Sequence, residues 1–297
     1  MTQQAAPGAP LDILVCVKRV PMVGGRVVLT ADGQDVDTRL SGFTVSPHEE
    51  CAVEEAIRLT EHAGGTVTVL TLGPPEATEQ LRDMLALGAH RGVLLETDGR
   101  EWGPVATAAA IAQAIEDLQA PAFPLVLLGN EAADTGGYQV GVRVAHTLGR
   151  PCVTGIKSLE LAGAGLRAGR ERGAVYEFFE LPLPAVVSVK EGINLPRYPS
   201  LPGRLRAKRA EITVLRPRWQ PDALRKIGLR VPAGASRQAQ PLGTGVDAIP
   251  ELVRVLGELG VLPGAARPAV ASPAVASPAV ASPAVASPAG TETGQRA

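Results

Sequence analysis

The sequence has few cysteines and histidines, and they are scattered. The three cysteines, Cys16, Cys51 and Cys152, include no C-x-x-C pair, and the four histidines do not fall at metal-ligand spacing. We therefore expect neither a disulfide framework nor a metal site. Reduced, partly buried cysteines of this kind are typical of a cytoplasmic protein, and that is the location we expect.

An excess of charge of one sign and a long apolar run are also missing. The 297 residues include 29 Lys and Arg against 30 Asp and Glu, so no global basic field favours nucleic acid. No run approaches the length of a membrane span, and residues 1–11 lack both regions of a signal peptide. We expect no nucleic-acid partner, no membrane insertion and a flexible N-terminus over 1–11.

Motifs of catalysis are absent as well. The sequence has no nucleophile elbow, no H-E-x-x-H, no Walker lysine motif and no carboxylates at metal spacing. We assign no catalytic residue, and we expect a protein that is not an enzyme.

What the sequence does contain is an alternation of strand and helix patterns. Apolar, β-branched runs recur at 12–20, 66–72, 92–96 and 124–128, separated by segments with helical spacing. The pattern predicts an α/β fold, a Rossmann-like parallel sheet with flanking helices. Short strand-like pieces after residue 150, among them 185–191, predict that antiparallel hairpins extend this sheet.

The predicted helices are marked by their ends. The first follows Ser46 as N-cap, with Pro47 at its first position and Glu49 completing a capping box. Three more are predicted over about 75–87, 104–118 and 138–148, two of which stop at glycine.

The C-terminal part divides by composition. We expect the α/β domain to span 12–215, with an exposed basic loop at 191–209 in which three prolines rule out regular structure. We then expect a linker at 216–245, an amphipathic helix at 246–262, and a disordered Pro-Ala-Val-Ala-Ser repeat tail at 265–297.

Three turns leave the strand ends where ligands bind in a doubly wound sheet: 18–23, 46–49 and 130–141. In the third, Gly136 and Gly137 permit close backbone approach, and a helix starting near Tyr138 directs N–H groups at a phosphate. Asp134 would repel a phosphate, so we expect it to accept hydrogen bonds from backbone amides or a ribose. Glycines that serve only the turn, and a purely structural cap at Ser46, are the open alternatives.

Several segments together resemble a known family. ILVCVKRVP, SPHEECAVEEAIRL, LVLLGNEAADTGGYQVG and NLPRYPSLP occur in the order and spacing of the β subunit of electron transfer flavoprotein. The resemblance implies a heterodimer with an α subunit that accepts electrons from flavin-linked dehydrogenases and passes them to a quinone reductase. It also implies one FAD, held mostly by the α subunit, and a structural AMP in the β subunit.

The resemblance assigns site residues. The AMP pocket would be lined by Cys16, Ser46, Pro47, His48, Glu49 and Leu72, and by Ala132 through Arg143, including Asp134, Gly136, Gly137, Tyr138, Gln139, Val140 and Gly141. Leu201 would dock on the dehydrogenase, flanked by Arg206, Lys208 and Arg209. The helix at 246–262 would pack against the α subunit or against its own domain.

Three positions depart from the family. Cys16, Ser46 and His48 stand where alanine, asparagine and an aromatic are common. His48 either faces the isoalloxazine and tunes its potential, or is an exposed histidine at a helix start.

Two kinds of alternative remain for the function. One is the electron-bifurcating type, in which a second FAD replaces AMP. The other is an ATP-using enzyme or a nucleotide-sensing module of the same fold.

Overall fold

The computed structural model describes residues 10–22, 27–98, 102–118, 123–221, 226–231 and 241–262. The expected repeat tail, most of the N-terminus and part of the linker lie outside these residues. The chain divides into two compact units, Met1–Pro232 and Ala233–Ala297. No described helix is long and apolar enough to cross a bilayer.

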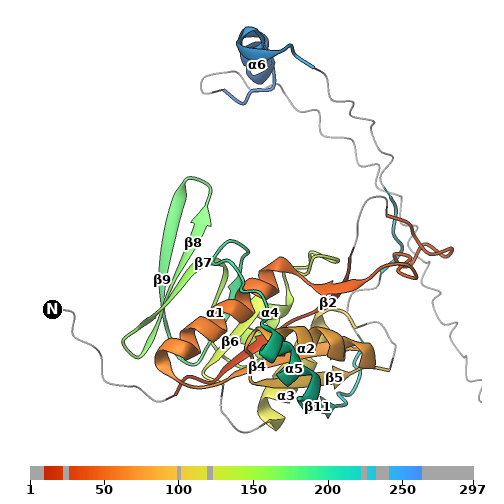
Figure 1. Cartoon of the computed structure of the whole chain (residues 1–297), viewed down its shortest axis with the longest axis vertical. Helices are drawn as coiled ribbons and strands as arrows, with labels where there is room; N and C mark the ends of the chain where they lie inside the picture. The colour runs from red at the N-terminus through yellow and green to blue at the C-terminus, as the bar shows by residue number, and fades with distance from the viewer. Residues whose placement is uncertain are drawn as a thin grey trace, which may run out of the picture. The chain divides into compact units, whose positions relative to one another are not determined.

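The first unit is built on a nine-stranded sheet (Figure 1). Its strand order is β11-β5-β4-β1-β6-β10-β7-β8-β9. All neighbours from β11 to β7 pair in parallel, whereas β7, β8 and β9 pair antiparallel. The α/β fold with an antiparallel extension is therefore confirmed. The strands are β1 (Ile13–Cys16), β4 (Val67–Gly73), β5 (Arg91–Glu96), β6 (Leu125–Gly129), β7 (Cys152–Ala162), β8 (Gly165–Arg172), β9 (Val175–Pro182), β10 (Ala185–Val189) and β11 (Ile212–Leu215).

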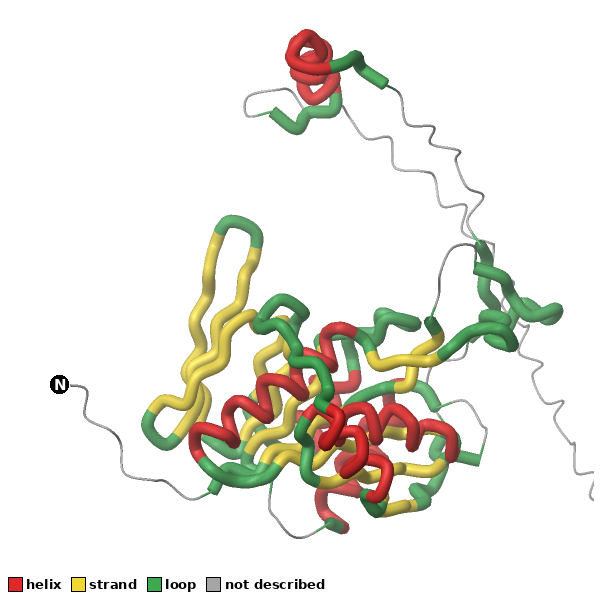
Figure 2. The backbone as a smooth tube through the Cα atoms, in the orientation of Figure 1, coloured by secondary structure: helices red, strands yellow, loops and turns green. Residues whose placement is uncertain are grey.

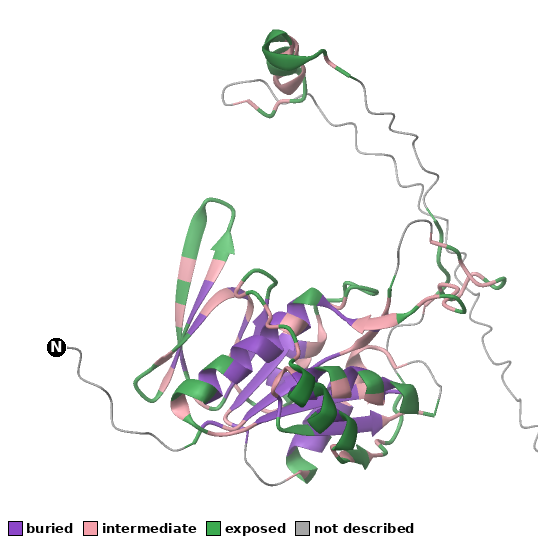
Figure 3. Ribbon diagram, viewed as in Figure 1, coloured by how far each residue is buried: buried purple, intermediate pink, exposed green. Residues whose placement is uncertain are grey.

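Helices cover both faces of the sheet (Figure 2). Because side chains alternate along a strand, Ile13 and Val15 of β1 pack with α1 (Pro47–Ala63) and α2 (Thr78–Leu87). Leu14 and Cys16 pack on the other face with α3 (Pro104–Asp117) and α4 (Val140–Thr147). Figure 3 shows the strands and the inner helix faces buried, while the tip of the β8–β9 hairpin is exposed.

The four helices of the sheet were predicted within a few residues. A 3-10 turn, η1 (Pro75–Ala77), precedes α2, and α4 starts two residues later than expected because Gly136 and Tyr138 have positive φ. A small antiparallel sheet of β2 (Arg19–Pro21) and β3 (Phe43–Val45) was not predicted.

Two sequence predictions were wrong. The segment 185–191 does not form a hairpin, because β10 inserts in parallel between β6 and β7. Residues 201–209 are not a loop but the helix α5 (Leu201–Arg209). Ser200 Oγ caps this helix by accepting the Gly203 N–H (3.1 Å), and Pro202 lies in the first turn, where a missing N–H has no cost.

The second unit contains the 3-10 helix η2 (Gly245–Ala248) and the α-helix α6 (Ile249–Glu258), which is shorter than the helix predicted at 246–262. Ile249, Leu252 and Val253 are exposed within the described residues.

Candidate functional site

The crevice of interest lies where the chain reverses its direction across the sheet. From β1 the chain proceeds to β4 and then β5 on one side, and it next crosses to β6 on the other side of β1. In open α/β sheets, ligands bind outside the carboxyl ends of the strands at such a switch point. The crevice is therefore bounded by the segments that follow Cys16 and Gly129.

The start of α1 packs directly over the end of β6. A Cβ at Gly129 would lie 2.6 Å from Glu49 Cγ and 3.3 Å from His48 Cβ, so only glycine permits this approach. The turn at 46–49 and the loop after β6 therefore meet.

Glu49 is the most deeply buried carboxyl of the crevice. Its Oε2 accepts the backbone N–H of Lys18 at 2.9 Å. Burial raises the pKa of Glu49 to about 8, and the Lys18 N–H opposes this shift only in part. Glu49 is therefore largely uncharged near neutral pH and ties the end of β1 to the start of α1.

The expected side-chain cap at Ser46 does not form. Ser46 precedes α1 in extended conformation, but its side chain makes no hydrogen bond to a helical N–H. The residue is fully buried, and its hydroxyl lies beside the Glu49 carboxyl, where it helps to lower the pKa of that group. Pro47 does occupy the first turn, as predicted.

His48 is buried, so the alternative of an exposed histidine is wrong for this chain. Its Nδ1 accepts the Glu191 N–H at 2.9 Å, and its Nε2 lies 3.3 Å from Glu131 Oε1. The imidazole thus joins the segment after β10 to the loop after β6. Its orientation toward a flavin stays a prediction.

Lys18 begins the predicted ligand turn 18–23 but was not itself assigned to the pocket, and its side chain reaches across the crevice. Its Nζ lies 2.7 Å from Asp134 Oδ1 and 3.4 Å from Thr135 Oγ1. Asp134 therefore pairs with a lysine, where the sequence predicted backbone amides or a ribose. Lys18 could have been found from the sequence, because it lies two residues beyond a strand end at this edge.

The loop after β6 is shaped by two residues with positive φ. Gly136 has φ of 54° and donates its N–H to Ala132 O, and Tyr138 has φ of 55°, which is unusual for a residue with a side chain. At Gly137, a Cβ would meet no described atom within 4 Å. The backbone at 136–138 is therefore open to a ligand.

The start of α4 supplies hydrogen-bond donors. The first α-helical bond runs from Arg143 N to Gln139 O, so the N–H groups of Val140, Gly141 and Val142 have no intrahelical acceptor. These donors and the helix dipole favour an anion. Gly141 itself serves packing, because a Cβ there would lie 2.5 Å from Ser188 Oγ.

The remaining predicted pocket residues line the strand ends. Cys16 ends β1, and burial, followed by the charge of Glu49, raises the pKa of its thiol to about 12. The thiol is therefore not a nucleophile at neutral pH. Leu72 of β4 is partly buried against the α3/α4 side of the core.

A groove of about 460 Å³ adjoins the loop, between α3 and α4. Tyr138, Gln139 and Arg143 line one side of it, and Val105 and Ala108 line the other.

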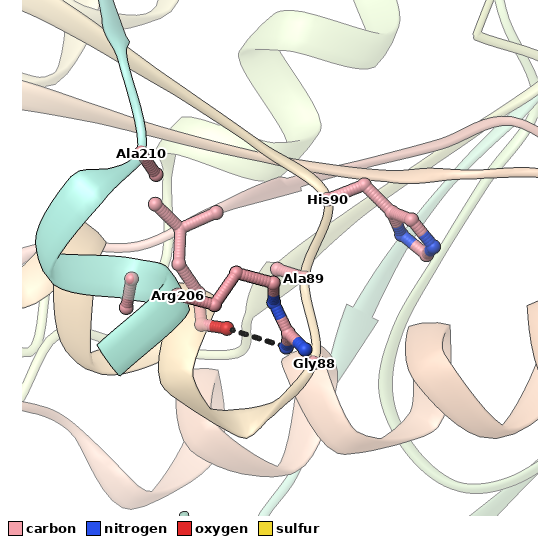
Figure 4. Close-up of a pocket in the computed structure, with 7 residues that line it drawn as sticks. Gly88, Ala89, His90, Arg206 and Ala210 are labelled. Atoms are coloured by element: carbon pink, nitrogen blue, oxygen red, sulfur yellow. Dashed lines mark hydrogen bonds between the residues drawn. The ribbon is translucent and has the colours of Figure 1, made fainter. Parts of the chain in front are cut away.

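The predicted docking residues lie on α5. Leu201 is 72% exposed at the first position of this helix, and Lys208 and Arg209 are exposed near its end. Arg206 reaches across a pocket of about 300 Å³ to the end of α2, where it donates to Leu85 O at 3.4 Å (Figure 4). Arg82 of α2 also donates to the carbonyls of Ala207 and Lys208, so α5 is fixed on α2.

The segment before α5 is fixed along α1. Arg197 forms ion pairs with Glu54 (2.9 Å) and Glu61 (2.7 Å), and Asn194 donates to Glu55 Oε2 at 2.9 Å. This bracing, which the sequence did not predict, presents Leu201 from a rigid support.

Comparisons with known proteins agree on one family. The profile described as "Electron transfer flavoprotein domain" matches residues 36–218. The chain is 39% identical over 208 residues to the electron transfer flavoprotein subunit beta of Bacillus subtilis (strain 168), covering 69% of this chain and 79% of that one. It is 36% identical over 226 residues to the Mycobacterium leprae (strain TN) subunit, with 74% and 82% covered. The Bradyrhizobium diazoefficiens subunit is 35% identical over 257 residues, with 85% and 100% covered.

Proposed function

We propose that the chain forms a heterodimer with an α subunit and carries electrons, because it belongs to the electron transfer flavoprotein family as a β subunit. The heterodimer accepts electrons from flavin-linked dehydrogenases and passes them to a quinone reductase. One FAD, held mostly by the α subunit, supplies the redox chemistry. The crevice between β1 and β6 holds AMP as a structural ligand.

The observation that carries this proposal is a crevice built for an anion but without reacting groups. The start of α4 and the open backbone at Gly137 suit a phosphate. The adjacent Cys16 thiol and Glu49 carboxyl are buried and largely uncharged at neutral pH. Such a site binds a nucleotide without hydrolysing it, which favours a carrier over an ATP-using enzyme.

An ion pair between Lys18 and Asp134 crosses the crevice. It joins the two segments that bound the crevice, at an Nζ to Oδ1 distance of 2.7 Å. AMP and FAD both carry phosphate groups, to which an ammonium group such as that of Lys18 can donate hydrogen bonds. The second FAD of a bifurcating type is therefore an outcome to be tested.

The test is to co-express the chain with its α subunit, denature the purified complex, and count the released nucleotides by chromatography. We expect one FAD and one AMP per heterodimer. Two FAD without AMP would place a redox flavin in the crevice and refute the structural-AMP assignment. Hydrolysis of added ATP by the heterodimer would refute the proposed electron-carrier function.

A glycine variant locates the nucleotide. Gly137→Ala adds a methyl group where no described atom lies within 4 Å, so it obstructs the ligand and not the fold. Gly228→Ala is the matched control, since its Cβ would make only ordinary contacts, at 3.7 Å and beyond. We expect AMP loss in the first variant alone; equal AMP content in both would place the nucleotide elsewhere.

A further inference from the structure

The loop after β6 contains no lysine or arginine before Arg143, yet the structure brings one cation to it. Lys18 extends from the end of β1 and places its ammonium group within hydrogen-bonding distance of Asp134 and Thr135. Its side chain remains 40% exposed. Lys18 is thus a cation of the crevice that comes from another part of the chain.

The base of Lys18 is held while its end is accessible. The backbone N–H of Lys18 donates to the buried Glu49, which itself packs against Gly129. This fixes the backbone of Lys18 relative to the end of β6. Loss of the lysine side chain would leave that backbone hydrogen bond in place.

The charges around the crevice require such a cation. Asp134 and Glu131 both come from the loop, and Glu131 lies beside His48. Arg143 donates twice to Gln139 Oε1 and is engaged on α4. Without Lys18, the Asp134 carboxylate would lose the cation with which it pairs, and the loop would present more negative charge to a phosphate.

We propose that Lys18 is the phosphate-binding cation of the crevice and neutralises Asp134 in the same position. An ammonium group has three donors, of which Asp134 and Thr135 take two, so one is available to a phosphate oxygen. The assignment rests on the proposed function, because it takes the ligand to be an adenine nucleotide. It adds a binding residue from outside the glycine-rich loop.

The test compares two ligands that differ only in the phosphate. AMP and adenosine are titrated by calorimetry into the heterodimer after its own nucleotide has been removed. Lys18→Met should weaken AMP binding by roughly 10-fold or more, the scale of a lost hydrogen bond between charged groups, and leave adenosine binding unchanged. Lys18→Arg should retain most of the AMP affinity.

A matched control is available in Lys226. Its Nζ also lies 2.7 Å from an aspartate, Asp35 Oδ1, outside the crevice. Lys226→Met removes the same charge and the same type of ion pair, so we expect AMP affinity to stay at the wild-type value.

The possible results distinguish a failure of the Lys18 assignment from a failure of the proposed AMP site. Wild-type heterodimer that binds neither AMP nor adenosine would refute the proposed AMP site. Wild-type binding of both, with AMP affinity unaltered in Lys18→Met, would refute the role of Lys18 alone. Equal losses of AMP and adenosine affinity would also refute it, because they would show a structural role and not a phosphate contact.

Discussion

Glu49 should make the stability of the chain fall as pH rises through the neutral range. Its pKa is raised from 4.5 to about 8 by burial. Between those values the folded state retains a proton that the unfolded state has released. The folded state therefore binds more protons, and the free energy of unfolding decreases with increasing pH across this window.

The magnitude follows from the size of the pKa shift. Each pKa unit corresponds to about 1.4 kcal/mol, so this group lowers the free energy of unfolding by roughly 3–4 kcal/mol between pH 5 and pH 8. Glu49→Gln removes the titration and keeps an oxygen that can accept the Lys18 N–H. The variant should therefore gain stability relative to wild type as pH rises.

The assay is urea unfolding of both proteins at several pH values, followed by circular dichroism. Taking the difference between the two proteins cancels the other titrating groups. Glu76→Gln, which alters an exposed carboxyl on η1, controls for the loss of one charge. A wild-type to Glu49→Gln difference that is the same at pH 5 and pH 8 would refute the reasoning.

Three further predictions concern docking, redox tuning and bracing. Leu201→Ala should slow electron acceptance from the dehydrogenase roughly 10-fold or more, which corresponds to the free energy of burying one leucine side chain, and should leave the FAD content unchanged. Leu40→Ala, at another exposed leucine, is the control. Equal rates in the two variants would contradict docking through Leu201. His48→Phe should shift the flavin midpoint potential by on the order of 30 mV, and a redox titration with an unchanged midpoint would remove the tuning role. Arg197→Met should lower the free energy of unfolding in urea by about 3 kcal/mol, because the buried Glu54 loses its cation and keeps only the backbone N–H of residue 197. Adding Glu54→Gln should recover part of this loss, and the absence of recovery would argue against the ion pair.

The parts of the fold predicted from sequence are those fixed by local pattern. The runs that became β1, β4, β5 and β6 are apolar on both faces, as parallel strands buried between helices require. Pro47 placed the start of α1 for a similarly local reason, since a proline fits the first turn of a helix.

The parts that sequence reasoning missed depend on distant partners. β10 follows β9 after only two residues, which suggested another hairpin strand, and only its pairing with β6 and β7 shows that it is central. α5 was hidden by its prolines, although Ser200 and Pro202 are ordinary residues for a helix start. The pairing of Lys18 with Asp134 spans 116 positions, a separation that no local pattern reports.

The crevice and α5, the helix that carries the predicted docking residues, share one support, which is α1. Its first turn carries His48 and Glu49, which contact the loop after β6, the end of β1 and the segment after β10. Farther along the same helix, Glu54 and Glu61 hold Arg197, three residues before the cap of α5. A ligand that ties the crevice together therefore stabilises the helix on which the docking segment rests. The AMP that we propose for the crevice would in this way stabilise the support of the proposed docking helix without taking part in redox chemistry.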